Sequence, residues 1–295
     1  MDNLFDFDLT ARLLGLDFVG NALIAAAILG LLAGVLGPLI VSRNMAFSVH
    51  GTSELAFTGG AAALLLGVGV GVGALAGAVI AALVLGLLSR RTAEYDSVIG
   101  AVLAFGLGLG VLFLWIYPGR TSNKFGLLVG QIVGVDFASI LLLSVCAVVV
   151  LGVLAVIYRP LLFASVDPDV AAARGVPTGV LAPVFAVLVG VATALGVQTV
   201  GALLVLALMV TPAAAAARVT ASPLRATVLS VLFAQASVLG GIVLSLAPGA
   251  PVSAFVTAIS FVIYLVCRAI GKLRGRATRL SPAAGAPVPH RSAIR

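Results

Sequence analysis

The sequence predicts an all-α polytopic membrane protein, a bundle of about 8 to 10 transmembrane helices. Of its 295 residues, 62% are hydrophobic and only 9% are charged. The mean hydropathy is +1.26. Soluble domains carry about 25% charged residues, so this composition lies outside their range. The apolar residues also fall in successive runs of the length needed to cross a bilayer, about 20 residues for each helix.

Charged residues and Gly/Pro clusters separate the predicted spans. The nine spans cover residues 18–41, 47–67, 72–89, 97–117, 138–158, 179–197, 200–217, 226–246 and 252–270. Gly67–Gly73 is either a turn or a close helix crossing, and residues 197–217 are either a full span or partly re-entrant. The predicted domains are an extracytoplasmic segment (1–17), the transmembrane domain (18–270) and a basic, disordered cytoplasmic tail (271–295).

The arginines orient the chain. If the acidic N-terminus lies outside, most loop arginines fall on one side, which the positive-inside rule assigns to the cytoplasm. They are Arg43, Arg90, Arg91, Arg159, Arg174, Arg218, Arg225 and the arginines of the tail. Arg120 and Lys124 oppose the assignment. We expect a multi-pass protein of the plasma (inner) membrane with a cytoplasmic C-terminus. The net charge of +7 then reflects loops and tail beside anionic lipid, with no nucleic acid as partner.

Glycine is frequent, with 34 residues. Some are spaced four apart and form small-xxx-small faces, which let helices approach closely in lipid. The clearest pairs are Gly30/Gly34, Gly73/Gly77 and Gly106/Gly110. We expect these faces to pack within the bundle; a dimer face is the alternative. Cys146 and Cys267 lie in apolar runs without ligand spacing and are predicted to be buried.

An ionisable pair lies inside the second span. His50 and Glu54 are four residues apart, so a helix places them on one face. An imidazole beside a carboxylate suits a divalent metal or a proton, and such groups are expensive at membrane depth. The hydroxyls of Ser53 and Thr58 are further candidate ligands. The alternative is a buried pair that only fixes helix packing.

The sequence lacks the motifs of the common catalytic sites. It contains no P-loop, no HExxH zinc motif and no GxSxG nucleophile elbow. We therefore predict that the chain is not an enzyme and binds no cofactor of its own. A transporter or channel without its own motor fits these observations.

A polar insert, Val166–Val176, separates two apolar spans on the predicted cytoplasmic face. Asp167 is placed to cap a short helix, with Pro168 at its first position and Gly175 beyond its end. A short helix parallel to the membrane suits docking to a cytosolic partner. An ordinary helical loop is the alternative.

Five segments, taken in order, resemble one family. They are Gly37–Met45, Asp96–Gly100, Gly130–Gly134, Asp167–Val176 and Val200–Arg218. The chain resembles the permease subunits of ATP-binding-cassette importers for zinc or manganese, the metal-uptake ABC-3 family with the type II importer fold. The resemblance covers about residues 20 to 270.

The resemblance implies a permease that moves a divalent metal from an external solute-binding protein to the cytoplasm by alternating access. Separate cytosolic ABC ATPase subunits would drive it, and a second permease copy would complete a homodimer. The coupling segment would be Asp167, Pro168, Asp169, Ala171, Arg174, Gly175 and Val176. The family commonly has an aspartate followed four residues later by a histidine in the second span. Here His50 and Glu54 hold those positions in swapped order, as metal ligands whose preferred cation is open.

Three other functions remain open from the sequence. A siderophore or haem importer permease has the same architecture, although a wide path without a ligand pair would favour it. A proton-coupled secondary transporter would use His50 and Glu54 as a relay, although inverted repeats and broken helices are not clear in the sequence. A membrane scaffold would use the pair only for packing.

Overall fold

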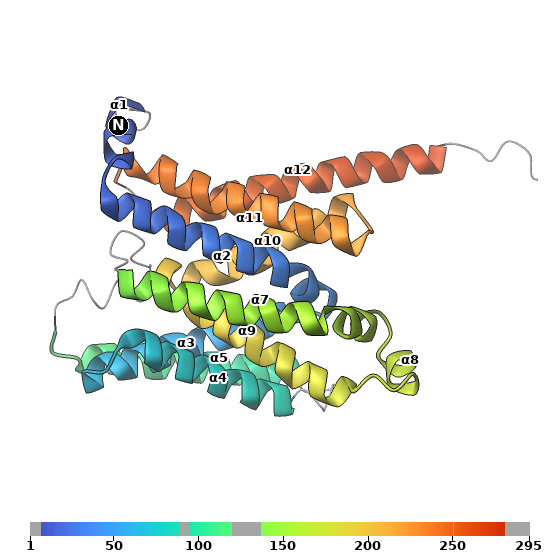
Figure 1. The fold of residues 1–295 in the computed structure, drawn as a ribbon, viewed down its shortest axis with the longest axis horizontal. Coiled ribbons are helices and arrows are strands. Elements are labelled where there is room, and N and C mark those ends of the chain that lie inside the picture. The colour runs from blue at the N-terminus through green and yellow to red at the C-terminus, as the bar shows by residue number, and fades with distance from the viewer. Residues whose placement is uncertain (1–6, 89–94, 120–136, 250, 281–295) are drawn as a thin grey trace, which may run out of the picture.

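The computed structural model describes residues 7–88, 95–119, 137–249 and 251–280, and within these ranges all regular structure is helical. The helices are α1 (Phe7–Leu14), α2 (Asp17–Ser42), α3 (Ala46–Leu66), α4 (Val70–Leu88), α5 (Tyr95–Ile116), α7 (Phe137–Val166), α8 (Pro168–Ala173), α9 (Thr178–Val200), α10 (Ala202–Val219), α11 (Pro223–Leu246) and α12 (Val252–Leu280). Each of the nine predicted spans is a helix. The long helices run side by side along one direction, so the all-α bundle is confirmed (Figure 1).

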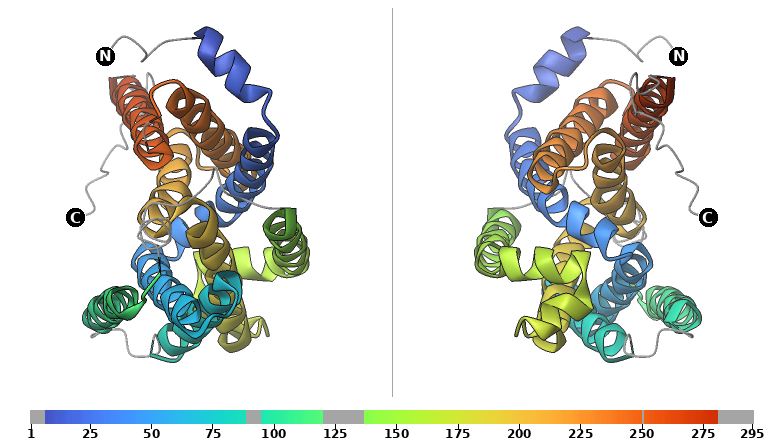
Figure 2. Two further views of the ribbon diagram at one scale, coloured as in Figure 1. Left: turned by 90° about the vertical axis from the view of Figure 1, so that its left-hand side faces the viewer. Right: turned by 90° about the vertical axis from the view of Figure 1, so that its right-hand side faces the viewer.

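The long helices form two groups, which are visible when the bundle is viewed from either end (Figure 2). In the first group α2, α10, α11 and α12 pack against one another. In the second, α3 packs against α4, α5 and α9. The groups meet where α10 contacts α3 and α9, and α7 lies across α2 and α9. Helix α3 therefore lies at the junction of the two groups.

Helix α3 differs from the other long helices in the number of polar side chains that it buries. In the part of the chain that the structure describes, six helices are long and apolar enough to cross a membrane by length and composition, and shorter apolar helices run over Val70–Leu85 and Leu204–Val219. Helix α3 instead carries a run of buried polar side chains. They are Ser48, Thr52, Ser53, Glu54 and Thr58. The helix can hold these groups at membrane depth because four neighbouring helices surround it.

Glycines allow the closest helix contacts. A Cβ at Gly59 on α3 would clash with the backbone of Gly73 and Gly77 on α4. A Cβ at Gly34 on α2 would clash with the backbone of Val231 on α11, and one at Gly106 on α5 would lie 3.2 Å from Leu55 on α3. All three predicted small-residue faces thus lie at contacts within the bundle, as expected from the spacing.

The structure describes both ambiguous stretches, and each contains a glycine with a positive φ at a helix end. Gly67 has φ +71° and ends α3, and α4 begins at Val70, so Gly67–Gly73 contains a turn that leads into a close crossing. Gly201 has φ +87° and joins α9 to α10 with one residue. Glycine suits both positions because other residues rarely adopt a positive φ.

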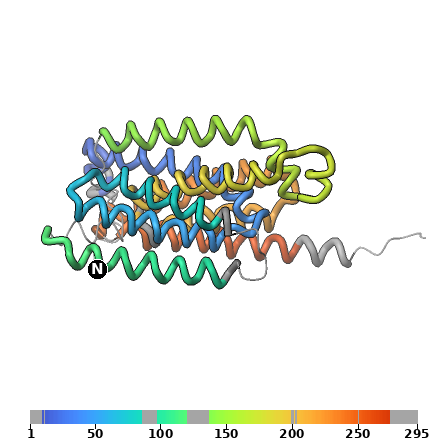
Figure 3. Tube along the Cα trace, turned by 90° about the horizontal axis from the view of Figure 1, so that it is seen from below, coloured from blue at the N-terminus to red at the C-terminus, as the bar shows by residue number. Residues whose placement is uncertain are grey.

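Two helices extend beyond their predicted spans. Helix α7 continues past Pro160 to Val166, beyond the predicted end of the span at residue 158. A proline removes one backbone hydrogen bond, but neighbouring helices can satisfy the freed carbonyl group in a membrane bundle. Helix α12 reaches Leu280, beyond residue 270, and extends past the neighbouring helices (Figure 1). Figure 3 shows the same bundle from below, with the long helices side by side. Residues 281–295 of the predicted tail lie outside the described part of the chain.

Candidate metal site and coupling helix

Helix α3 positions the predicted ligand pair. It begins at Ala46, immediately after the tight turn at Arg43–Met45, so His50 falls in its second turn and Glu54 in the next. The structure confirms that both residues lie on one continuous helix, with the spacing that aligns them on a single face. His50 is partly buried and Glu54 is 4% exposed.

Both members of the pair have unsatisfied polar atoms. The Nδ1 atom of His50 and the Oε2 atom of Glu54 are buried and have no hydrogen-bond partner. Buried polar atoms are nearly always paired, so each exception requires an explanation. Two exceptions one turn apart on the same face favour a shared cause, such as a ligand that accepts both a nitrogen and an oxygen donor.

His50 borders a pocket of about 370 Å³ between α3 and α10. Phe47 and Ala46 line it from α3. The residues that line it from α10 are Leu206, Ala207, Val210 and Thr211. Phe47 is 63% exposed, so the pocket opens onto the surface of the single chain. The sequence did not indicate that α10 faces His50, because the two segments are far apart along the chain.

Glu54 lies against α5. A Cβ at Gly106 would lie 3.5 Å from the Cβ of Glu54, which places Glu54 beside α5. Thr58 donates to the carbonyl oxygens of Glu54 and of Gly106, and so joins α3 to α5. Ser53 donates to the carbonyl oxygen of His50 over 2.8 Å. These two hydroxyls, expected as extra ligands, therefore have their protons engaged by backbone groups.

Within the described residues, no cluster of three or more His, Cys, Asp or Glu side chains is placed to hold a metal ion. A site built on His50 and Glu54 would therefore have no third ligand of these residue types from the described part of the same chain. Cys146 and Cys267 are free cysteines; Cys267 is buried in α12, as predicted, whereas Cys146 in α7 is only partly buried.

The polar insert folds as its sequence indicates. Pro168–Ala173 forms α8, and the Oδ1 atom of Asp167 accepts a hydrogen bond from the backbone N–H of Val170 at 3.0 Å. Arg174 is the C-cap residue, and Gly175 follows with φ +81°. Ala171 is fully buried, whereas Asp169 and its neighbours on the outer face are exposed. One face of α8 thus packs on the bundle while the other is free for a partner.

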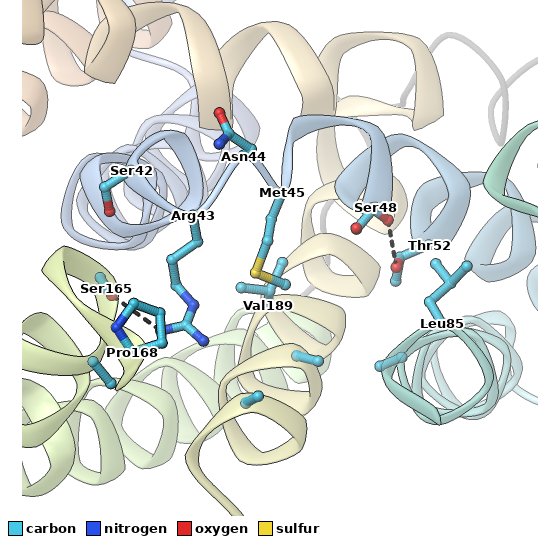
Figure 4. Close-up of a pocket in the computed structure, with 14 residues that line it drawn as sticks. Ser42, Arg43, Asn44, Met45, Ser48, Thr52, Leu85, Ser165, Pro168 and Val189 are labelled. Carbon is cyan, nitrogen blue, oxygen red and sulfur yellow. Dashed lines mark hydrogen bonds between the residues drawn. The ribbon is translucent and has the colours of Figure 1, made fainter. Parts of the chain in front are cut away.

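A second pocket, of about 300 Å³, lies beside α8 (Figure 4). Arg43, Asn44 and Met45 line it from the turn between α2 and α3, Ser165 lines it from the end of α7, and Pro168 lines it from the start of α8. Arg43 donates to the Oγ of Ser165 at 3.0 Å. In the sequence Arg43 marked the cytoplasmic side and lay in one segment of the family resemblance, and nothing there indicated its contact with a residue 122 positions away.

Two of the segments that carried the resemblance are not placed in full. Gly130–Gly134 lies outside the described residues, and for Asp96 only the backbone helix is described. The other segments lie at the α2–α3 turn, at α8 and along α10. The first two regions lie at the end of the bundle near α8. The third includes α10, the helix that faces His50.

The fold and these sites define a class: a multi-pass, all-helical transport subunit with a polar helix in its interior and a short surface helix at one end. The chain belongs to the ABC 3 transport family, whose model matches residues 15–271. It is thus a membrane permease of an ABC transporter, and in such transporters ATP hydrolysis belongs to a separate subunit. The family predicted from the sequence is confirmed.

Several known proteins are similar to this chain. The manganese transport system membrane protein MntC of Halalkalibacterium halodurans is 30% identical over 207 residues, 70% of each chain. The manganese import system permease protein ScaB of Streptococcus parasanguinis is 32% identical over 189 residues, 64% of this chain and 67% of that protein. A chain of PsaBC from Streptococcus pneumoniae, solved in complex with Fab, matches with a TM-score of 0.80 and 23% identity. The match covers 90% of this chain and 99% of that one, and it supports the fold.

Proposed function

We propose that this permease imports manganese or a chemically related divalent cation, and that His50 and Glu54 contact the ion as it crosses. The unsatisfied Nδ1 atom of His50 and Oε2 atom of Glu54 carry the proposal, because one cation would satisfy both. The names of the manganese permeases MntC and ScaB support this choice of substrate. The metal is the substrate, and the chain needs no resident cofactor.

The proposal includes a second copy of the chain. First-row divalent metals take at least four ligands, and one chain offers two. A homodimer that brings two α3 helices together would offer four. The surface opening beside Phe47 and His50 supports this arrangement, because a second copy would cover it.

The other partners lie at opposite ends of the bundle. We propose that α8, with Asp167, Pro168, Asp169, Ala171, Arg174, Gly175 and Val176, docks on a cytosolic ABC ATPase. An extracytoplasmic metal-binding protein would deliver the ion at the other end. This orientation places the N-terminus outside and the C-terminus in the cytoplasm of a plasma (inner) membrane, in agreement with the positive-inside rule.

Metal uptake into proteoliposomes tests the proposal. The permease is reconstituted with its ATPase, the binding protein and Mn²⁺ are added outside, and uptake is measured with and without internal ATP. His50→Ala and Glu54→Gln should each abolish uptake, because each removes one ligand, while assembly with the ATPase is retained. Thr52→Val is the matched control, since Thr52 is equally buried on α3 but lines the other pocket.

Three outcomes would contradict the proposal. Normal uptake by both ligand variants would exclude the pair from the metal path. Uptake driven by a proton gradient without ATP would indicate a secondary transporter. Uptake of a siderophore or haem in place of the free ion would indicate the siderophore or haem importer considered from the sequence.

A further inference from the structure

Arg43 lies at the turn that connects α2 to α3. It is the C-cap residue of α2, and the chain enters α3 at Ala46. A displacement of Arg43 therefore moves the start of the helix that carries His50 and Glu54. The turn is tight, because Asn44 adopts φ +54° and the N–H of Met45 donates to the carbonyl oxygen of Ile40. The short, hydrogen-bonded turn therefore holds Arg43 close to the start of α3.

The guanidinium of Arg43 joins this turn to two other helices. It donates to the Oγ of Ser165 on α7 at 3.0 Å, and it lies over the ring of Phe185 on α9, 5.7 Å from the ring centre. Ser165 is held in turn by its own donation to the carbonyl oxygen of Leu161 at 2.6 Å. Figure 4 shows Arg43 reaching from its turn toward Ser165 and Pro168.

Ser165 lies directly before the coupling helix. Asp167, the N-cap of α8, follows two residues later, and the N–H of Asp167 still donates to the carbonyl oxygen of Phe163 at the end of α7. The end of α7 and the start of α8 are thus one continuous, hydrogen-bonded unit. Movement of α8 must shift Ser165 with it.

The contact between Arg43 and Ser165 joins a charged side chain to a neutral one. Among the described residues, no carboxylate lies within ion-pair distance of Arg43, and its contacts are one hydroxyl and one aromatic face. Burial lowers the pKa of Arg43 and so disfavours its charged form. Several residues that line the same pocket are small, such as Ala164, Ala182 and Ala186. A pocket of about 300 Å³ beside a partly buried cation gives the two sides room to move.

We infer that Arg43 is a positioning residue for transport, which transmits the movement of α8 through Ser165 to the start of α3 and its metal-ligand pair. The inference rests on the proposed function, since it takes α8 as the ATPase contact and His50 with Glu54 as the metal ligands. Arg43 touches neither the metal nor the ATPase. Its role is to make the start of α3 move together with α8.

The test measures coupling, the number of Mn²⁺ ions imported per ATP hydrolysed. The complete transporter with its binding protein is reconstituted in proteoliposomes, and both rates are recorded. Arg43→Gln and Ser165→Ala should each lower the ratio about tenfold, the size expected for losing one hydrogen bond to a charged group. The double variant should be no worse than the worse single variant, because both remove the same link.

Two further variants separate the link from general damage. Ser165→Thr keeps the acceptor oxygen and should keep the ratio. Arg159→Gln removes an exposed arginine near the same end of α7 and should leave the ratio unchanged. If Arg43→Gln fails to insert in the membrane, the Ser165→Ala and Ser165→Thr pair decides the question alone.

An unchanged ratio in both single variants overturns the inference, as do losses that multiply in the double variant. A failure of the proposed function looks different, because the wild-type transporter itself would then show no ATP-dependent Mn²⁺ uptake. If wild-type uptake is normal but Ala172→Pro in α8 has no effect on coupling, the assignment of α8 is wrong and the inference fails with it.

Discussion

The carboxylate of Glu54 and the imidazole of His50 are held in the bundle at a free-energy cost. Each has a buried polar atom without a partner, and such an atom destabilises a protein by about 1–3 kcal/mol. The cost is acceptable if the same atoms bind a passing ion. Binding of the ion need not be tight, because a residue on a transport path also has to release the ion.

The order of the two ligands leads to a prediction at the residue scale. His50→Asp with Glu54→His preserves one nitrogen and one carboxylate ligand at the same helical spacing, in the order common in the family. The double variant should therefore recover part of the metal uptake that each single variant loses, with a changed preference between Mn²⁺ and Zn²⁺. Competition uptake assays measure this preference. Failure of the double variant to exceed either single variant would show that the local surroundings, not the ligand types, decide function.

Single residues also show what a sequence can and cannot predict. The His50–Glu54 spacing and the Asp167 cap depend on neighbours within a few positions, so they could be predicted. The pocket between His50 and α10 and the Arg43–Ser165 contact join segments far apart in the chain. Helix packing alone determines those contacts, and no local pattern reports them.

At the scale of helices, the contact of α3 with α4 depends on glycine. The backbones of Gly59 and Gly73 are so close that no Cβ fits between them. In lipid, such close backbone contact replaces the hydrophobic drive that is missing between helices.

The span boundaries near these helices could be predicted because apolar runs end at turns. The ends of α7 and α12 could not, because a proline or a basic residue does not always end a helix.

The glycine contact gives a second prediction. Gly73→Ala places a methyl group against the backbone of Gly59 and the side chain of Ala63, and should destabilise the bundle by about 1–3 kcal/mol. Thermal unfolding of the purified protein in detergent measures the loss. Gly152→Ala on α7 is the matched control, since nothing lies within 4 Å of the added Cβ, and its unfolding temperature should stay the same or rise. Equal stability of the two variants would show that α4 can move away from α3 without penalty.

At the scale of the whole molecule, charge and shape agree on an orientation. Figure 1 shows that α2, α7 and α10 end, and α11 begins, toward the end of the bundle that carries α8. The arginines in or beside these helix segments and α8 are Arg43, Arg159, Arg174, Arg218 and Arg225. Asp17 begins α2 at the opposite end. Lipid bilayers retain positive residues on the cytoplasmic side. The end with α8 is therefore expected to face the cytoplasm, where an ATPase can reach it.

Cysteine labelling in intact cells tests this orientation. In a chain with Cys146→Ala and Cys267→Ala, a new cysteine is placed at Val68, in the turn between α3 and α4, or at Ala221, between α10 and α11. Both positions are exposed but lie at opposite ends of the bundle. A membrane-impermeant maleimide should label Val68→Cys in intact cells and Ala221→Cys only after permeabilisation. The reverse pattern would place α8 outside the cell, where no ATP-hydrolysing partner exists, and would overturn both the orientation and the coupling role of α8.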